Sequence, residues 1–334
     1  MLSRVSDCLY WMSRSVERAE NIARILDVNL QLMLDLPQQQ ARQLDKNWIA
    51  VAECLGDDEA FRKTKAKADC ATVTDFLVFN RDNPNSIVSC LASARENART
   101  VREQISTEMW EQLNRSYLWA TSRAAKAAYQ RSQYDFFQSV KEISHLFQGI
   151  TDSSMTHGEG WEFIQIGRFL ERADKTSRVL DDKFHLLHTL GVSASDQRQW
   201  VAVLRSCSAR QAYQKIYVSE VRPAKVAELL LLDESFPRSV LFCVSEVDNA
   251  LRRISGTPPG RFANLAEKLS GRFSSELRYS TIEELIEPGL HRTADLLQIR
   301  FNQIGSAIYQ NYIHLALPVE PRPKKVPQAE QAQQ

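Results

Sequence analysis

Apolar residues recur every three or four positions along most of the chain, a spacing typical of amphipathic helices. One such face, centred on Val16, contains Leu9, Met12, Ala19, Ala23, Leu26 and Leu30. A later segment presents the same face with Phe163, Ile166, Leu170, Ala173, Leu180 and Phe184. The chain has 11 glycines and 11 prolines, too few for the tight turns of a β-sandwich or barrel. The fold is therefore predicted to be all-α, with both faces in its core.

Three windows of the chain resemble later windows at a spacing of about 153 residues. The aligned windows are Met12–Asp27 with Ile166–Asp181, Trp48–Val51 with Trp200–Val203, and Pro84–Cys90 with Pro237–Cys243. Because their order and spacing agree, the sequence predicts two pseudo-symmetric helical repeats.

The repeats are expected to cover residues 1–155 and 156–317. No long linker separates them, so we expect one merged bundle over residues 1–317. Residues 318–334 are rich in proline and glutamine and have few large apolar side chains. Such a segment cannot bury enough surface to fold, and we expect a disordered tail.

The 42 basic and 41 acidic residues almost balance, which leaves a net charge of +1. Without an excess of positive charge, neither nucleic acid nor a membrane surface is an expected partner. No run of 18 apolar residues occurs, and Arg4, Asp7 and Arg14 interrupt the N-terminal segment, so we expect a cytoplasmic protein. The six cysteines never form C-x-x-C, which favours free buried thiols over disulfides or a zinc site.

Charged residues border the apolar face in both long segments and form what we call the charged strip. Its members are Glu17, Glu20, Arg24 and Asp27 in the first repeat, and Glu171, Asp174, Arg178 and Asp181 in the second. Helical spacing predicts i,i+4 pairs Glu20–Arg24 and Asp174–Arg178, and i,i+3 pairs Arg14–Glu17 and Arg168–Glu171.

Two interpretations of the charged strip stay open. The strips could be ion pairs that fix the register of the two halves. Alternatively, pseudo-symmetry could bring them together in a polar cleft that binds a charged group.

A metal site is a further alternative. Glu142-x-x-His145 and Asp182-x-x-His185, with Glu17 and Glu171, could hold two ions in a helical bundle. Two-residue motifs arise often by chance, so no metal ligand is assigned and the histidines are expected to be half-buried hydrogen-bond partners. No phosphate-binding loop or catalytic serine or cysteine motif is evident, and the sequence does not identify a cofactor.

Specific motifs stand within the charged strip. The first segment reads R-S-V-E-R-A-E-N over Arg14–Asn21, and the second reads W-x-F-x-x-x-G-R-x-x-E-R-A-D over Trp161–Asp174. With Asn83–Ile87 and Phe236–Val240, they make the chain resemble the alpha-E family, bacterial helical proteins with a Glu-Arg motif. The resemblance runs from Met1 to about Leu317.

The resemblance implies a functional context. Genes of this family accompany a circularly permuted ATP-grasp ligase, with transglutaminase-like proteases nearby, which implies an accessory or catalytic subunit of a peptide ligation or modification system. Both proteins are therefore expected partners. The implied catalytic candidates are Glu171 and Glu17, and the ligand-binding candidates are Arg172, Arg168, Arg18, Arg14, Asp174 and Arg178. A non-enzymatic helical scaffold and the di-metal bundle are the alternatives.

Overall fold

The fold is seen in a computed structural model, which describes residues 1–35, 45, 48–189, 197–218 and 220–314. Side chains of residues 182–189 are not described. The expected tail, residues 318–334, lies outside the described residues.

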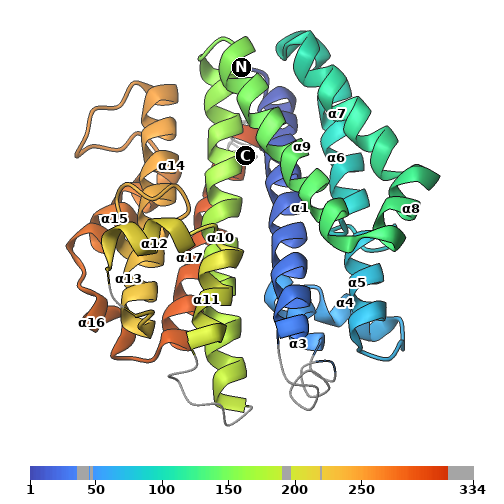
Figure 1. The fold of residues 1–334 in the computed structure, drawn as a ribbon. Coiled ribbons are helices and arrows are strands. Elements are labelled where there is room, and N and C mark those ends of the chain that lie inside the picture. The colour runs from blue at the N-terminus through green and yellow to red at the C-terminus, as the bar shows by residue number, and fades with distance from the viewer. Residues whose placement is uncertain (36–44, 46–47, 190–196, 219, 315–334) are drawn as a thin grey trace, which may run out of the picture.

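Helices make up 79% of the described residues, which include no strand, so the predicted all-α fold is confirmed. The two longest helices, α1 (Ser3–Asp35) and α10 (Glu159–Thr189), lie side by side at the centre (Figure 1). None of the described helices is both long enough and apolar enough to cross a membrane. The central pair therefore forms the axis on which the other helices pack.

Further helices flank each side of this central pair (Figure 1). Between α1 and α10 the chain forms α3 (Ile49–Leu55), α4 (Asp58–Lys63), α5 (Cys70–Val78), α6 (Ile87–Thr100), the 3₁₀ turn Arg102–Gln104, α7 (Thr107–Ala120), α8 (Arg123–Arg131) and α9 (Gln133–Ser154). After α10 it forms α11 (Gln197–Ser206), α12 (Arg210–Ile216), α13 (Pro223–Leu232), α14 (Val240–Ser255), α15 (Leu265–Tyr279), α16 (Ile282–Ile286), α17 (Leu290–Ile308) and a π-helical turn (Tyr309–Ile313).

Helices α6 and α14 each begin after a serine that caps the first turn. Ser86 accepts a hydrogen bond from the Ser89 amide at 3.2 Å, and Ser239 accepts one from the Phe242 amide at 3.0 Å. Each serine thus satisfies an amide that the first helical turn leaves free. These caps lie at aligned positions of the sequence windows, as the repeat predicts. The repeat itself stays a prediction that superposition of the two halves would test.

One hydrophobic core contains apolar side chains from both halves. Leu26, Leu170 and Leu180 are at most 2% exposed, as the helical pattern predicts. None of the six cysteines forms a disulfide, and five of them are buried while Cys70 is half-buried, which confirms the predicted thiols.

Gly167 lets α1 and α10 approach closely. A Cβ atom at this position would lie 2.4 Å from the carbonyl oxygen of Tyr10, well inside van der Waals contact. Any larger residue here would push the two central helices apart.

We therefore expect Gly167→Ala to lower the free energy of unfolding by about 1–3 kcal/mol, because the added methyl group overpacks the helix crossing. Gly149, on the exposed side of α9, is the matched control, since a Cβ there meets nothing within 4 Å. Gly149→Ala should raise stability by about 0.5–1 kcal/mol through helix propensity alone. Urea denaturation measures both, and a stabilising Gly167→Ala would contradict the close approach.

Candidate functional site

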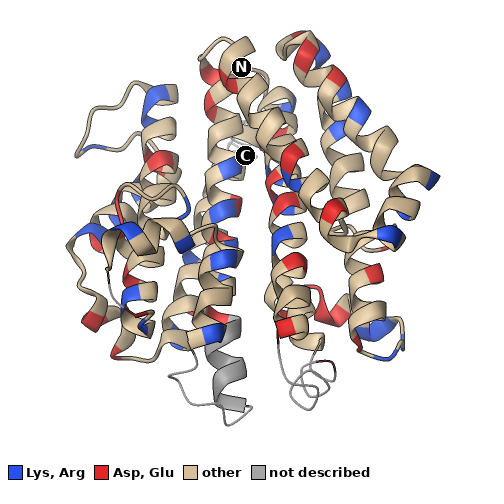
Figure 2. Cartoon of the chain, in the orientation of Figure 1, with Lys and Arg blue, Asp and Glu red and all other residues tan. Residues whose placement is uncertain are grey.

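Two Glu-Arg pairs cross between the central helices, where acidic and basic residues follow one another along both (Figure 2). Glu171 of α10 accepts from Arg18 of α1, with Nε–Oε1 at 2.7 Å and Nη2–Oε2 at 3.0 Å. Glu17 of α1 accepts from Arg172 of α10, with Nε–Oε1 at 2.8 Å and Nη2–Oε2 at 2.9 Å. Both carboxylates are buried, and we call these contacts the reciprocal pairs.

Arg14 also binds Glu171, with its Nε 2.9 Å from Oε2, and it donates from Nη1 to the Tyr10 hydroxyl at 2.8 Å. The expected Arg14–Glu17 pair is therefore wrong, because the guanidinium reaches across to the other helix. The expected Arg168–Glu171 pair is likewise not formed among the described side chains. The i,i+4 pair Asp174–Arg178 is confirmed at 2.9 Å, and Glu20–Arg24 is confirmed as well.

Glu171 is charged in spite of its burial. Removal from water raises the pKa of a carboxyl, but the charges of Arg18 and Arg14 outweigh that effect and hold the pKa of Glu171 well below its ordinary value. The carboxylate thus serves as a fixed counter-charge for two arginines.

The surroundings of Glu17 are closed by other side chains of the protein. Arg238, from the loop before α14, places Nη1 3.2 Å from Glu17 Oε1. Gln148 of α9 donates to Glu17 Oε2 at 3.1 Å, and Ser144 donates to Glu20 at 2.8 Å. The adjoining cavity measures about 10 Å³, room for about one water molecule. We call this arrangement the sealed cluster.

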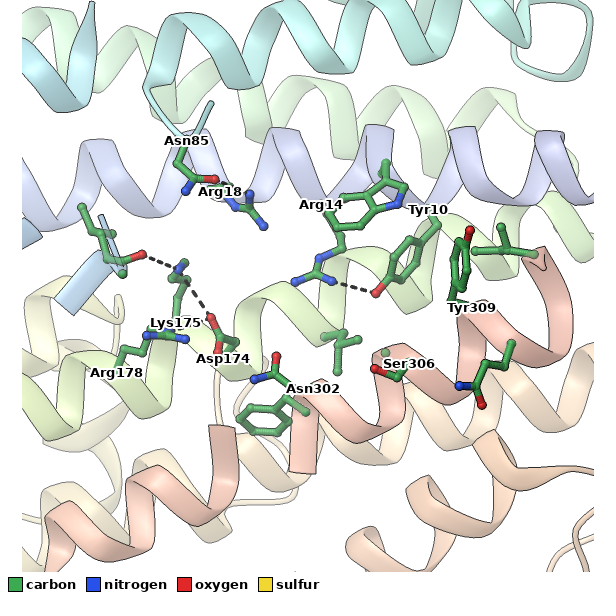
Figure 3. A pocket seen from close by; sticks show the side chains of 18 residues that line it. Tyr10, Arg14, Arg18, Asn85, Asp174, Lys175, Arg178, Asn302, Ser306 and Tyr309 are labelled. Atoms are coloured by element: carbon green, nitrogen blue, oxygen red, sulfur yellow. Dashed lines mark hydrogen bonds and ion pairs between the residues drawn. The ribbon is translucent and has the colours of Figure 1, made fainter. Parts of the chain in front are cut away.

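The surroundings of Glu171 instead open into a cavity of about 660 Å³ between α1, α10 and α17 (Figure 3). Four basic residues line this open cavity: Arg14, Arg18, Lys175 and Arg178. Asp174 is the one acidic residue among the lining residues.

Positive charge exceeds negative charge around the open cavity. Asp174 accepts from Arg178, and Lys175 Nζ lies 3.4 Å from its Oδ2. Two further carboxylates lie behind the lining residues. One is Glu171, and the other is Asp57, whose Oδ1 accepts a hydrogen bond from Asn85 Nδ2 at 2.7 Å. Burial raises the pKa of Asp57. Even with all three carboxylates ionised, they oppose four cations, so a net positive charge remains.

Side-chain length explains why only one of the two regions is open. Asn85 stands at the sequence position aligned with Arg238, and it is too short to fill the space that an arginine fills in the sealed cluster. Asn302 of α17 follows Gln148 of α9 by 154 residues, the shift between Met12–Asp27 and Ile166–Asp181, and Figure 3 places it opposite Asp174. The reciprocal pairs are thus alike, while the residues around them differ in size.

The predicted site residues divide between these two regions. Those that line the open cavity are Arg14, Arg18, Asp174 and Arg178, and Glu171 lies directly behind them. Those at the sealed cluster are Glu17, Arg172 and Arg168.

Sequence reasoning missed Lys175, Asn85 and Asn302. Lys175 could have been found, because it replaces the uncharged Asn21 at the aligned position of the first repeat. Asn302 lies in a segment without any motif, so only its place in the fold identifies it.

The described side chains do not assemble the di-metal site. His145 is 59% exposed, more than the half-buried position expected of it, and its Nε2 lies 3.4 Å from Glu20. Glu17 and Glu171 are both engaged by arginines, and the side chains of Asp182 and His185 lie outside the described residues. Elsewhere, Asp181, His291 and Asp295 bring possible metal-ligand atoms within 4.8 Å of one another.

We expect Glu171→Gln to lower the free energy of unfolding by about 3–5 kcal/mol at pH 7, because it leaves two half-buried guanidinium groups without their buried counter-charge. Because folding lowers the pKa of Glu171, its carboxylate contributes fully to the free energy of unfolding above the unfolded-state pKa of 4.5. This contribution is lost as the pH falls toward the folded-state pKa. The difference in the free energy of unfolding between wild type and Glu171→Gln should therefore become smaller below about pH 4.5.

Urea denaturation between pH 7 and pH 3 measures this difference. Glu276, which is 46% exposed and pairs with Arg300, provides the control. Glu276→Gln should cost about 1 kcal/mol or less. Equal effects of the two substitutions would show that the reciprocal pair contributes no more than a surface pair.

Comparison with known proteins identifies relatives of the chain and its family. Two uncharacterized proteins, Mb2597 of Mycobacterium bovis and Rv2567 of Mycobacterium tuberculosis, are each 27% identical to the chain over 302 residues. The match covers 85% of this chain and 33% of each relative, so the chain spans about a third of the length of these curated relatives. No solved structure matches the chain. The model of the Alpha-E family, described as a predicted alpha-helical domain with a conserved ER motif, matches residues 1–313, and the chain therefore belongs to this family.

Proposed function

We propose that the open cavity binds an anionic ligand through a carboxylate or phosphate group. The observation that supports this is the convergence of four basic side chains in a cavity whose carboxylates do not balance them. Its volume falls within the range of about 300–1,000 Å³ typical of small-molecule sites. Charge-assisted hydrogen bonds to such a ligand are stronger in a partly buried site than in water.

The basic groups are already held in place before a ligand binds. Arg18 is fixed by Glu171 on one side and donates from Nη1 to Asn85 at 2.6 Å on the other. Arg178 is held by Asp174, and Lys175 donates to the Leu55 carbonyl at 3.3 Å. Little side-chain entropy then remains to be lost on binding, which favours affinity.

Neither Glu171 nor Glu17 is a catalytic residue in this proposal. Glu171 is fully buried, and the arginines that lower its pKa make it a weak base. Glu17 faces the sealed cluster, away from the open cavity. In place of a catalytic role, Glu171 therefore orients Arg14 and Arg18 toward the ligand, and Glu17 holds Arg172 in the sealed cluster.

We further propose that the chain acts in the cytoplasm as an accessory subunit of a peptide ligation or modification system. Its partner would be a circularly permuted ATP-grasp protein, and a transglutaminase-like protease is a second candidate partner. ATP-grasp chemistry passes through carboxylate substrates and acyl phosphates, and both are anions that the open cavity could hold. The charge of the cavity is the feature of this chain that supports the proposal.

Arg178→Gln should weaken the binding of methyl phosphate about tenfold, because it removes one cation from the cavity. Arg24→Gln is the matched control: Arg24 also pairs with a carboxylate four residues away, but it does not line the cavity. Isothermal titration calorimetry at low salt should show an affinity for Arg24→Gln close to that of wild type. Equal weakening by both substitutions, or no binding by wild type, would contradict the proposed site.

In the ligation system, ATP turnover by the ATP-grasp protein should rise when this chain is added. Arg178→Gln should lower that stimulation, since the ligand is held less tightly, whereas Arg24→Gln should leave it unchanged. A coupled assay of ATP hydrolysis, with a pull-down to verify association, measures both. Turnover that does not depend on this chain would contradict the accessory role.

A further inference from the structure

The open cavity has two chemically different ends (Figure 3). One end gathers Arg18, Asn85, Lys175 and Arg178. At the other end Tyr10 of α1 lies near Tyr309, the first residue of the π-helical turn. Arg14 stands between the two ends.

Exposed aromatic rings mark the second end. Trp11 and Tyr309 both line the cavity, and they are 38% and 49% exposed. The Tyr309 ring is held parallel to that of His314, at 6° and a centroid distance of 5.8 Å. Two large rings are thus presented to solvent at the cavity in fixed positions, although burying them would stabilise the fold.

The aromatic residues of α1 belong to the open side alone. The sequence alignment places Arg14 opposite Arg168, but it places Trp11 opposite Gln165 and Tyr10 opposite Ile164. The sealed cluster therefore packs against the central helices without these rings. The arginines of the sealed cluster, Arg168 and Arg172, lie instead against the buried Phe169 ring, at 5.1 and 5.6 Å from its centroid. The difference is that Tyr10 and Trp11 line the open cavity.

Arg14 joins the two ends of the cavity. Its guanidinium carbon lies 4.9 Å from the centroid of the Trp11 ring and 5.4 Å from that of Tyr10, while the same group binds Glu171. The opposite wall is the π-helical turn Tyr309–Ile313, a type of irregular turn that often occurs at functional sites.

We propose that Trp11, Tyr309 and Arg14 form a subsite for an aromatic ring, so that the ligand of the open cavity is an anion that carries a flat ring. This inference rests on the proposed anion-binding function. Ring faces attract other rings through offset or edge-to-face contacts, and a guanidinium stacks on a ring. An alkyl group of similar size would gain only the burial of its surface.

Phenyl phosphate and methyl phosphate test the subsite because they carry the same anionic group, with and without a ring. Calorimetry on the wild-type chain should show phenyl phosphate binding roughly tenfold more tightly. Trp11→Leu and Tyr309→Leu, made separately, should each reduce this ratio toward one while the affinity for methyl phosphate stays unchanged. Tyr279→Leu is the matched control, because Tyr279 is 86% exposed and does not line the cavity.

The outcomes separate this inference from the proposed function. If wild type binds neither compound, the anion site fails and the subsite fails with it. If methyl phosphate binds and the ring adds nothing, or if the gain survives both leucine variants, only the aromatic subsite is overturned. Because the two substitutions lie on different elements, misfolding of one variant leaves the other as a valid test.

Discussion

The reciprocal Glu-Arg pairs are the interaction on which the rest of this structure depends. A buried carboxylate and a buried guanidinium both lose water, and only close bidentate contact makes that loss tolerable. Such contact forms between α1 and α10 because Gly167 permits the helices to approach until a methyl group would touch the Tyr10 carbonyl. The register of the central helices is therefore fixed, and both halves pack around it.

The two reciprocal pairs are alike but stand in different surroundings. In the sealed cluster, Arg238 and Gln148 complete the hydrogen bonds of Glu17, and the ion pairs are structural. In the open cavity, Asn85 and Asn302 leave space that those longer side chains would occupy. Ion pairs fill one half of the charged strip, and a cavity opens beside the other half.

Arg168 shows that a buried positive charge near other cations is unfavourable in this protein. Burial and the nearby charge of Arg172 lower the pKa of Arg168 to about 10, and its Nε finds no hydrogen-bond partner among the described residues. Around the open cavity the excess positive charge faces solvent, where an anion can reach it. Binding energy at that site would come from relieving repulsion among fixed cations as well as from new hydrogen bonds.

The sequence by itself determined the helical fold, the buried faces of α1 and α10, and the position of the charged strip, because periodicity and i,i+4 spacing are local properties of a helix. The partners of the charges were decided by tertiary structure. Arg14 has Glu17 within reach on its own helix, yet it binds Glu171, since the approach of α10 offers a buried carboxylate that also holds Arg18. Tertiary structure also decided where the cavity opens. Asn302 belongs to no sequence motif, and its short side chain becomes part of the cavity wall only because α17 packs against α10.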